Sequence, residues 1–587
     1  MEQQQQGPEK KAIVAILLCV AVWAVWMQMN TNKQKAWREA QRANATPTPI
    51  AGAMTAGAGT NGAVAMTATS GTGGTIAAPG TPHESAGGVL WPITTAKLSN
   101  KVLELELSSR GARPMSADLK QYRASIKAGQ DASLVHLVTE TINGSNDVYP
   151  LAPWFGDAAD SRIPSDAVFE QVSAEEHEVV YRWTGADGLQ LTRTYRAEED
   201  GYVVLFTEEL KNVGTKPLTG RPGVVWATNF KGVKSGFMTP GDTEFTSAAG
   251  VNDRAQARNA KKPGEERIYG GLVDWIGITD RYFAAAIVPL EPRIDSKDAV
   301  HFFKPGTKST AAMALHPETT LEPGASRLFQ YQLYLGPKDY TLLLKAGHNL
   351  DRTIAWGGVL TPISKGLWHA LRWFHSWTNN WGLAIIVLTV IIRGLLSPLA
   401  AKQMKSANEF AGKSAKLKPA LDRLREKHKD DAMALNRETM LLYKQHGLSP
   451  FSPLVGCLPI LIQMPIWFAL YRVLYNSIDL RQAPFAFWIQ DLAAPDPWRV
   501  LPVLLGGVTF IQMKLTPNTG MDPAQARMML YTMPLIFTLP MMGLPSGLVL
   551  YIFTSTLMNI TQQWYLRRII PPAGGTSTVA AQQGGAT

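Results

Sequence analysis

The clearest pattern in this 587-residue chain is a set of long apolar runs separated by polar segments. One run covers residues 12–29, and five more lie at about 380–401, 453–475, 499–515, 527–542 and 545–565. Runs of this kind are long enough to cross roughly 30 Å of hydrocarbon as helices. The pattern predicts a polytopic α-helical membrane protein with six transmembrane helices. The short turn at 543–545 predicts that the last two helices form a tight hairpin.

A different pattern fills residues 89–345. Residues 102–107 alternate between apolar and polar, and the runs 179–183 and 189–195 flank Asp187-Gly188, a hairpin signal. Many short strands and few helical stretches predict an all-β domain built as a large sandwich. Residues 31–88, rich in Ala, Gly, Thr and Pro, are expected to be a flexible linker. The linker would join this domain to an N-terminal transmembrane anchor at residues 1–30.

Residues 360–378 have an amphipathic pattern. Apolar side chains recur at near-helical spacing, and basic side chains occupy other positions: Ile363, Leu367, Trp368, Leu371, Phe374 and Trp377 against Lys365, His369 and Arg372. We expect a helix that lies in the membrane interface. A core-packed soluble helix is the alternative, and the tryptophans weigh against it.

Positive charge predicts the orientation of the chain. Residues 402–447 hold eleven Lys and Arg against six Asp and Glu, and loops this basic stay in the cytoplasm. Counting from this loop places both termini in the cytoplasm and the β domain in the periplasm of a bacterial inner membrane. One local signal disagrees, because more basic residues follow the first run than precede it. The large loop has more weight, since late charges can fix topology. With only two cysteines, a disulfide framework is excluded.

The 402–447 segment is predicted to be a cytoplasmic helical hairpin. Residues 401–411 and 419–445 have helical patterns, and Pro419 is expected to break the helix between them. Two interpretations remain open. The segment is either a solvated charged face that only sets topology, or a mobile receiver for nascent chains, ribosomes or targeting factors.

One charge lies inside an apolar run. Arg393 is the single charged residue of the 380–401 run, and an arginine at mid-membrane costs about 2.5–3.5 kcal/mol on insertion scales. Its guanidinium must therefore contact water, a polar partner or a passing substrate. Lys402 lies nine positions later, roughly 13 Å along a helix. We expect Arg393 to lie in a water-filled groove that opens to the cytoplasm.

Several motifs resemble those of the YidC family of membrane protein insertases. They include Asn380-Trp-Gly382, Arg393-Gly394, Cys457-Leu-Pro-Ile-Leu-Ile-Gln-Met-Pro-Ile466, Leu480-Arg-Gln-Ala-Pro-Phe-Ala486 and Leu544-Pro-Ser-Gly-Leu-Val-Leu-Tyr551, and span about 356–568. Val273-Asp-Trp-Ile-Gly277 and Tyr334-Leu-Gly-Pro-Lys-Asp339 resemble the Gram-negative form. The resemblance implies a five-helix insertase core at 379–568 and a periplasmic supersandwich. Residues 569–587 are expected to be a disordered tail.

The resemblance also implies which residues line the groove. Arg393, Thr389 and Tyr551 match groove positions of the family, and Gln463 and Gln512 are added here as polar candidates. An apolar path for a sliding substrate helix is implied at Met464, Pro465, Trp467, Ile536 and Phe537. Ordinary helix packing or lipid contact is the alternative for each residue of this path, and a buried interhelical hydrogen bond is the alternative for Gln463 and Gln512. Ile552 stands where other members often have a second tyrosine, which puts more weight on Tyr551.

The expected function is that of an insertase and chaperone without catalytic residues, cofactor or metal. It would receive nascent membrane proteins and release their helices sideways into the bilayer, alone or with the Sec translocon and its accessory subunits. Ribosomes and the signal-recognition-particle pathway are candidate partners at the hairpin, and no direct nucleic-acid contact is expected.

Two other classes of function remain open. A solute transporter could use Arg393, but no internal repeat is visible. An enzymatic β domain is disfavoured because His136, His177, His301 and His316 are scattered and no carboxylate pair stands out.

Overall fold

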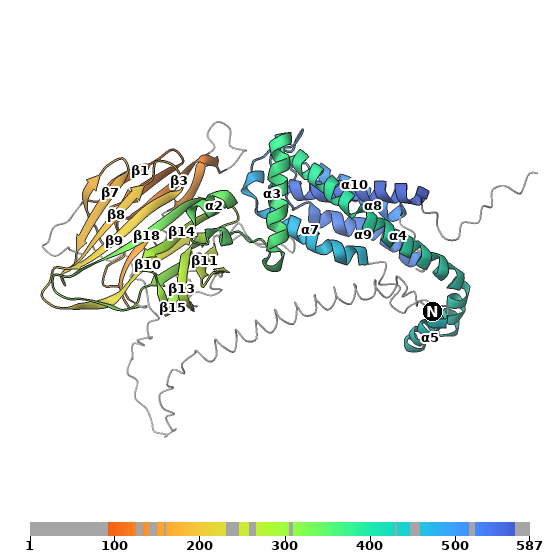
Figure 1. Cartoon of the computed structure of the whole chain (residues 1–587), viewed down its shortest axis with the longest axis horizontal. Coiled ribbons are helices and arrows are strands. Elements are labelled where there is room, and N and C mark those ends of the chain that lie inside the picture. The colour runs from red at the N-terminus through yellow and green to blue at the C-terminus, as the bar shows by residue number, and fades with distance from the viewer. Residues whose placement is uncertain are drawn as a thin grey trace, which may run out of the picture.

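The computed structural model describes residues 92–124, 133–139, 149–157, 160–229, 246–257, 266–303, 309–428, 431–445, 458–515 and 523–569. The anchor expected at 1–30, the linker at 31–88 and the tail after residue 569 lie outside these ranges. The described residues form a β region and a helical region, with helix α3 (Thr361–Thr378) between them (Figure 1).

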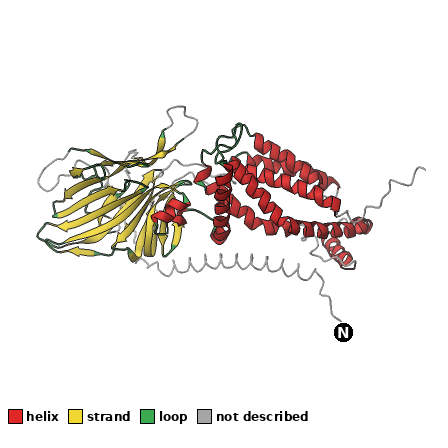
Figure 2. Cartoon of the chain, turned by 45° about the horizontal axis from the view of Figure 1, so that its top comes forward, coloured by secondary structure: helices red, strands yellow, loops and turns green. Residues whose placement is uncertain are grey.

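The β region contains two antiparallel sheets (Figure 2). The smaller sheet has the order β1-β2-β3-β4, with strands at Thr95–Ser99, Leu103–Ser108, Arg113–Arg123 and Leu134–Thr139. The larger sheet has 14 strands in the order β17-β10-β16-β15-β13-β14-β18-β9-β8-β7-β6, with β5, β11 and β12 attached beside this path. Its strands are β5 (Ala152–Gly156), β6 (Glu170–Ala174), β7 (Glu178–Thr184), β8 (Leu189–Ala197), β9 (Val203–Asn212), β10 (Leu218–Asn229), β11 (Thr246–Val251), β12 (Arg254–Ala257), β13 (Glu266–Thr279), β14 (Phe283–Glu291), β15 (Asp295–Phe303), β16 (Ser309–Leu315), β17 (Thr319–Leu321) and β18 (Ser326–Pro337).

Local sequence accounts for these strands. Leu103, Leu105 and Leu107 of β2 are buried, whereas the two glutamates between them are partly exposed, so the predicted alternation is confirmed. The predicted hairpin is also confirmed, because β7 pairs with β8 across a turn in which Gly188 has a φ of 85°. Glycine adopts this left-handed conformation without steric cost.

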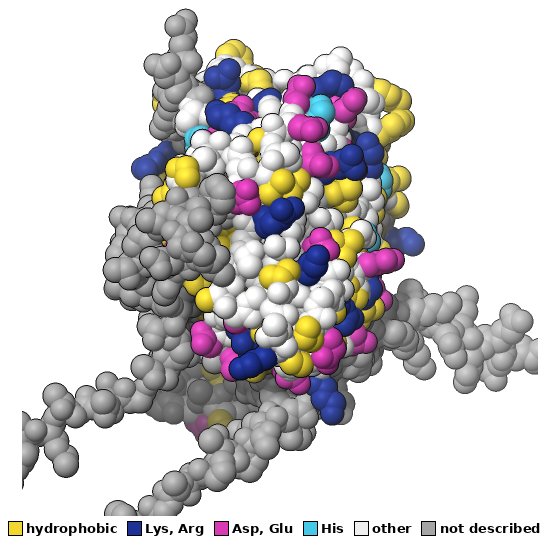
Figure 3. Space-filling model, turned by 90° about the vertical axis from the view of Figure 1, so that its left-hand side faces the viewer, with side chains coloured by type: hydrophobic (Ala, Val, Ile, Leu, Met, Phe, Trp, Pro, Cys, Tyr) yellow, Lys and Arg dark blue, Asp and Glu magenta, His cyan; other side chains and the backbone are white. Residues whose placement is uncertain are grey.

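The end of the β region that lies farthest from the helices is a mixed polar surface. Lys and Arg side chains alternate there with Asp and Glu, and hydrophobic side chains are scattered among them (Figure 3). Apolar side chains that are scattered singly in this way are normal for a surface that faces water.

The helical region contains α4 (Trp381–Lys427), α5 (Ala432–Gln445), α7 (Leu458–Asn476), α8 (Val500–Leu515), α9 (Pro523–Met541) and α10 (Ser546–Ile569). Helices α4, α7, α9 and α10 run side by side, and α3 lies across their ends (Figure 1). Within the described residues, Trp381–Lys402 is long and apolar enough to cross a membrane, with a mean hydropathy of 2.3. Val500–Leu515 and Leu530–Met541 are shorter apolar helices.

Two expectations about these helices are wrong. Pro419 does not break the chain into two helices, because α4 continues through Pro398 and Pro419 to Lys427. Pro419 is exposed, and it lines a pocket together with Leu424 of α4 and Leu441 and Leu442 of α5. The last two spans also do not pair as a tight hairpin. The turn between them is short, but α10 packs mainly on α4 and α8, and α9 packs on α8.

Hydrogen bonds tie the β region to the loop that joins α7 to α8. Arg481 and Gln482, in this loop, both donate to the carbonyl of Arg123 at the end of β3, at 2.6 and 2.8 Å. From the β region, Arg281 Nε donates to the carbonyl of Tyr475 in α7 at 2.6 Å. The α7–α8 loop therefore lies on the β-domain side of the helical region.

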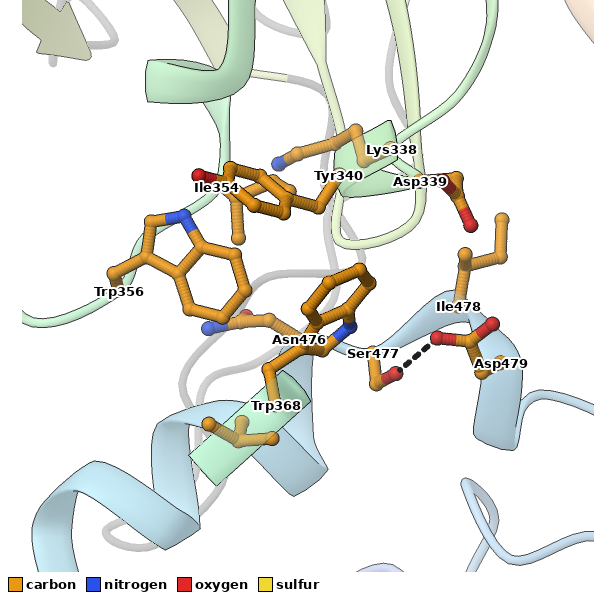
Figure 4. A pocket seen from close by; sticks show the side chains of 11 residues that line it. Lys338, Asp339, Tyr340, Ile354, Trp356, Trp368, Asn476, Ser477, Ile478 and Asp479 are labelled. Atoms are coloured by element: carbon orange, nitrogen blue, oxygen red, sulfur yellow. Dashed lines mark hydrogen bonds between the residues drawn. The ribbon is translucent and has the colours of Figure 1, made fainter. Parts of the chain in front are cut away.

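A small pocket lies at this junction, beneath α2 (Tyr340–Ala346) (Figure 4). The rings of Tyr340, Trp356 and Trp368 meet edge to face around it, with centroids 5.1 to 6.4 Å apart. Asp479 accepts a hydrogen bond from Ser477 Oγ at 3.0 Å. Burial raises the pKa of Asp479, and nearby positive charge opposes that shift. This packing holds α3 against both the β region and α7.

Candidate functional site

One face of α10 is polar along most of its length. Tyr551, Ser555, Asn559 and Gln562 follow one another at spacings of four, four and three residues, so they lie on the same side of the helix. Tyr551 and Ser555 are buried, and Asn559 and Gln562 are partly buried. Polar side chains inside a helical bundle need hydrogen-bond partners, and α4 supplies the main one.

Arg393 of α4 contacts this polar face and one residue of α7. Its Nε donates to Ser555 Oγ at 2.9 Å, and its Nη2 also donates to Ser555 Oγ. Its Nη1 donates to Asn559 Oδ1 at 2.8 Å and to Gln463 Oε1 at 3.1 Å. A single guanidinium therefore joins α4, α7 and α10. All three partner side chains are neutral. They therefore accept hydrogen bonds from the guanidinium but do not cancel its positive charge.

The same cluster is held at the backbone of α4 and extends to a buried phenol. Gln562 Nε2 donates to the backbone carbonyl of Arg393 at 3.0 Å. The Tyr551 hydroxyl contacts the side chains of Ser555 and Gln463. We call Arg393, Gln463, Tyr551, Ser555 and Asn559 the arginine cluster. It offers a fixed cation and several polar groups, which suits the binding of a carboxylate or a backbone carbonyl.

The remaining predicted groove residues lie outside the arginine cluster. Thr389 is buried, and its hydroxyl donates to the carbonyl of Ile385 in its own helix at 2.6 Å. Gln512 is a half-buried residue of α8 and is not among the residues bonded to Arg393. Of the residues predicted from the sequence, the structure brings together Arg393, Gln463 and Tyr551.

Sequence reasoning missed Ser555 and Asn559. A signal was present, because the two residues continue the spacing of Tyr551 along α10. Neutral polar residues are common in membrane helices, however, and their spacing does not show which neighbouring helix they face. Their role becomes visible only when α10 is placed against α4.

Most of the predicted apolar path is exposed on the outside of the helices. Met464 and Pro465 of α7 are exposed, as are Ile536 and Phe537 of α9, the last two at 56% each. Trp467 differs, because it is partly buried and its ring lies 4.9 Å from that of Phe468 and 6.1 Å from that of Tyr471. Trp467 is therefore less exposed than the other four residues of the path, and both of these ring neighbours belong to its own helix, α7.

Comparison with known proteins identifies the two regions separately. Residues 95–370 match the family model described as YidC periplasmic domain, and residues 373–573 match the model described as 60Kd inner membrane protein. Among the groups of His, Cys, Asp and Glu in the described residues, none has three or more members placed to hold a metal ion.

Relatives with the same name cover most of the chain. The membrane protein insertase YidC of Geobacter sulfurreducens is 36% identical over 470 residues, 79% of this chain and 85% of the relative. The protein of that name from Pelobacter propionicus is 30% identical, over 96% of this chain and 99% of the relative. A crystal structure of an active YidC insertase with its first transmembrane domain resolved aligns with 82% of this chain and 94% of that chain, at 18% identity and a TM-score of 0.33.

The sequence relatives decide the assignment, because they share at least 30% identity over most of both chains. The chain therefore belongs to the YidC family of membrane protein insertases, non-enzymatic proteins of the inner membrane that carry a periplasmic domain.

Proposed function

We propose that the arginine cluster is the place where this insertase receives the polar flank of a nascent membrane protein. The observation that carries the proposal is the uncancelled charge of Arg393, which three neutral side chains from two other helices hold in position. A carboxylate or carbonyl of the substrate can accept from the guanidinium, because charge-assisted hydrogen bonds are stronger than neutral ones. In a weakly screened site the attraction is larger than in water.

Insertion by this route needs no covalent chemistry. A polar flank that crosses hydrocarbon unaided leaves its backbone and charged groups without partners, which is costly. A polar groove in the inner half of the bilayer shortens that crossing. The substrate's apolar helix then moves sideways into lipid along Met464, Pro465, Ile536 and Phe537, and leaving water stabilises it there. The exposure of these four side chains supports this path.

We further propose a six-helix topology with both termini in the cytoplasm. The ends of α7 and α9 and the starts of α8 and α10 lie at the end of the helical region that contacts the β domain. The family's β domain is periplasmic, so this end faces the periplasm. Arg393 is twelve residues from the start of α4 at Trp381, which places it roughly 18 Å from that end. This depth supports a groove that opens toward the cytoplasm.

The extension formed by α4 and α5 supports the receiver interpretation of the basic segment. Its pocket is lined by both apolar and charged side chains, among them Leu424, Leu441 and Arg423. Met433 is 85% exposed and Met440 is 56% exposed. Methionine-rich surfaces adapt to varied apolar partners, and nascent membrane proteins are partners of this kind. Ribosomes, the signal-recognition-particle pathway and the Sec translocon are the partners we propose for this insertase.

Substitution of Arg393 tests the proposal. The full chain is reconstituted in liposomes, and the insertion of a single-span model protein with an acidic flank is measured. Arg393→Ala should impair insertion more than Arg393→Lys, since lysine keeps the charge but loses the planar fork of donors. Normal insertion by both variants would refute the proposal. Uptake of small solutes by the same vesicles would instead favour the transporter alternative, for which the relatives give no support.

Ser555 provides a second test, directed at the cluster itself. Ser555→Ala removes the partner of two Arg393 donors and should slow insertion in the wild-type background, but add little when Arg393 is already Ala, because linked residues are not additive. Thr561→Ala is the matched control on α10, since Thr561 is exposed and bonds only its own helix. Equal effects of Ser555→Ala in both backgrounds would show that Ser555 acts independently of Arg393.

The lateral path has its own test. A photo-crosslinker at Met464 should capture a stalled nascent chain, whereas one at Leu395 should not. Leu395 is 74% exposed but lies two residues from Arg393, on nearly the opposite face of α4. Equal capture at both positions would show contact with lipid-exposed surfaces in general, and not a defined path.

A further inference from the structure

An aromatic surface projects from the loop between α7 and α8. Phe487 is 88% exposed and Trp498 is 70% exposed, and Trp488 lies between them. The rings of Phe487 and Trp488 are 6.0 Å apart, and those of Trp488 and Trp498 are 5.8 Å apart and nearly parallel, at 14°. We call these three side chains the aromatic patch. Exposed rings of this size are costly in water and indicate a partner.

A buried carboxylate holds the aromatic patch in place. Asp496 is 3% exposed, and its Oδ1 accepts from Trp488 Nε1 and from the backbone N–H of Trp498, both at 3.0 Å. Its Oδ2 accepts from the backbone N–H of Leu501 at 2.7 Å. One side chain thus fixes both tryptophans and the first turn of α8. The hydrogen bonds of Asp496 therefore fix the conformation of the loop and the orientation of the patch.

The position of the patch points to its partner. The same loop forms a bridge between Pro495 and Pro545 at the start of α10, and its Arg481 bonds the β region. The patch therefore lies at the periplasmic end of the helices. The next turn of α8 exposes Val503 at 58% and Leu504 at 48%, so the patch is followed along the chain by exposed apolar side chains of a helix that we assign to the bilayer.

We propose that the aromatic patch lies in the headgroup–acyl boundary of the periplasmic leaflet and anchors the outer end of α8 there. Phenylalanine can enter the acyl edge, and tryptophan is preferred at this depth because its ring is amphipathic. The exposed side chain of Arg499 follows directly and can reach lipid phosphates while its stem covers apolar surface. The partner is the phospholipid bilayer itself, because the patch is continuous with side chains that face hydrocarbon. This inference is independent of the arginine cluster.

Spin labels measure the depth of the patch. Both native cysteines, Cys19 and Cys457, are first replaced by alanine in the full chain. A nitroxide is then attached at Phe487→Cys or Trp498→Cys, and the protein is placed in nanodiscs of phosphatidylethanolamine and phosphatidylglycerol with no other protein. Collisions with oxygen, which partitions into lipid, are compared with collisions with a water-soluble nickel chelate.

The expected result is that labels at 487 and 498 favour oxygen over the nickel chelate. Val213→Cys is the matched aqueous control, because Val213 is an exposed apolar residue of the β region that directly follows β9. Leu504→Cys is the reference inside the bilayer. Labels at 487 and 498 that behave like the one at 213 would overturn the proposal. Labels shielded from both reagents would also overturn it, because that result indicates burial against protein.

A second measurement leaves the loop unlabelled, since a nitroxide can draw a loop toward lipid. Tryptophan fluorescence is quenched with lipids brominated near the headgroup, and the wild type is compared with Trp498→Leu and with Trp226→Phe, which removes a buried tryptophan of the β region. Trp498→Leu should lower the quenched fraction of the emission, whereas Trp226→Phe should raise it. No fall in the quenched fraction for Trp498→Leu would place Trp498 in water and overturn the proposal.

Discussion

The β region contains a buried ion pair whose loss should have a large and measurable cost. Arg193 and Glu208, on the neighbouring strands β8 and β9, are 0% and 5% exposed, with Nη2 and Oε1 2.5 Å apart. Arg193 Nη1 also donates to the carbonyls of Gly111, Ala112 and Leu151 at 2.8 to 3.3 Å. The pair therefore links the large sheet to the segment that leads into β3.

Glu208→Gln keeps the shape of the side chain and removes its charge. The guanidinium of Arg193 stays buried without its counter-charge, and breaking a buried pair in this way costs about 3–5 kcal/mol. For a region of this size 1 kcal/mol corresponds to about 2–4 °C, so the melting temperature should fall by roughly 6–20 °C. Burial raises the pKa of Glu208, and the charge of Arg193 opposes that shift. Replacing a Glu208 that was already protonated in the folded protein would remove no charge and would cost little stability.

Thermal unfolding of the full chain in detergent, followed by tryptophan fluorescence, measures this cost. Glu209→Gln is the matched control, because the neighbouring side chain on β9 is half-exposed and surface changes stay within about 0.5 kcal/mol. A loss below about 1 kcal/mol for Glu208→Gln would refute the reasoning, since it falls well under the cost of an uncompensated buried charge.

Two further predictions concern acid stability and helix packing. Burial and two nearby arginines lower the pKa of His316 to about 3, so between pH 6.5 and 3 the unfolded chain binds a proton that the folded chain does not. The free energy of unfolding should therefore fall by up to about 1.4 kcal/mol for each unit by which the pH is lowered in this range. Urea titrations should show a weaker pH dependence of this free energy for His316→Gln but not for the exposed control His177→Gln. At the start of α4, a Cβ on Gly382 would collide with the ring of Phe485, so Gly382→Ala should destabilise the helices by about 1–3 kcal/mol. Gly394→Ala is the control, because, apart from its chain neighbours and the backbone of its own helix, nothing lies within 4 Å of its Cβ position, and alanine is favoured by about 0.5–1 kcal/mol inside a helix. Equal melting temperatures for the two variants would contradict the packing argument.

Local pattern predicted much of the fold. The alternation in β2 and the hairpin between β7 and β8 depend on neighbouring residues only, because side-chain period and turn conformation are local properties. The expected break at Pro419 is not found. Intrinsic preference disfavours proline inside a helix, yet α4 continues through Pro419 where α5 runs beside it.

The candidate site also has a part that local sequence predicts and a part that depends on helix packing. From the sequence alone it follows that a charge lies in the apolar run of Arg393, how far along the helix it lies, and that it requires a partner. The identity of the partners emerges from the packed helices: Gln463, Ser555 and Asn559 lie 70, 162 and 166 residues away along the chain. Periodicity shows which face of a helix is polar, but the hydrogen bonds of a guanidinium depend on which helices pack together and in what register. That choice is made by the packing of whole helices, so no local segment of the sequence contains it.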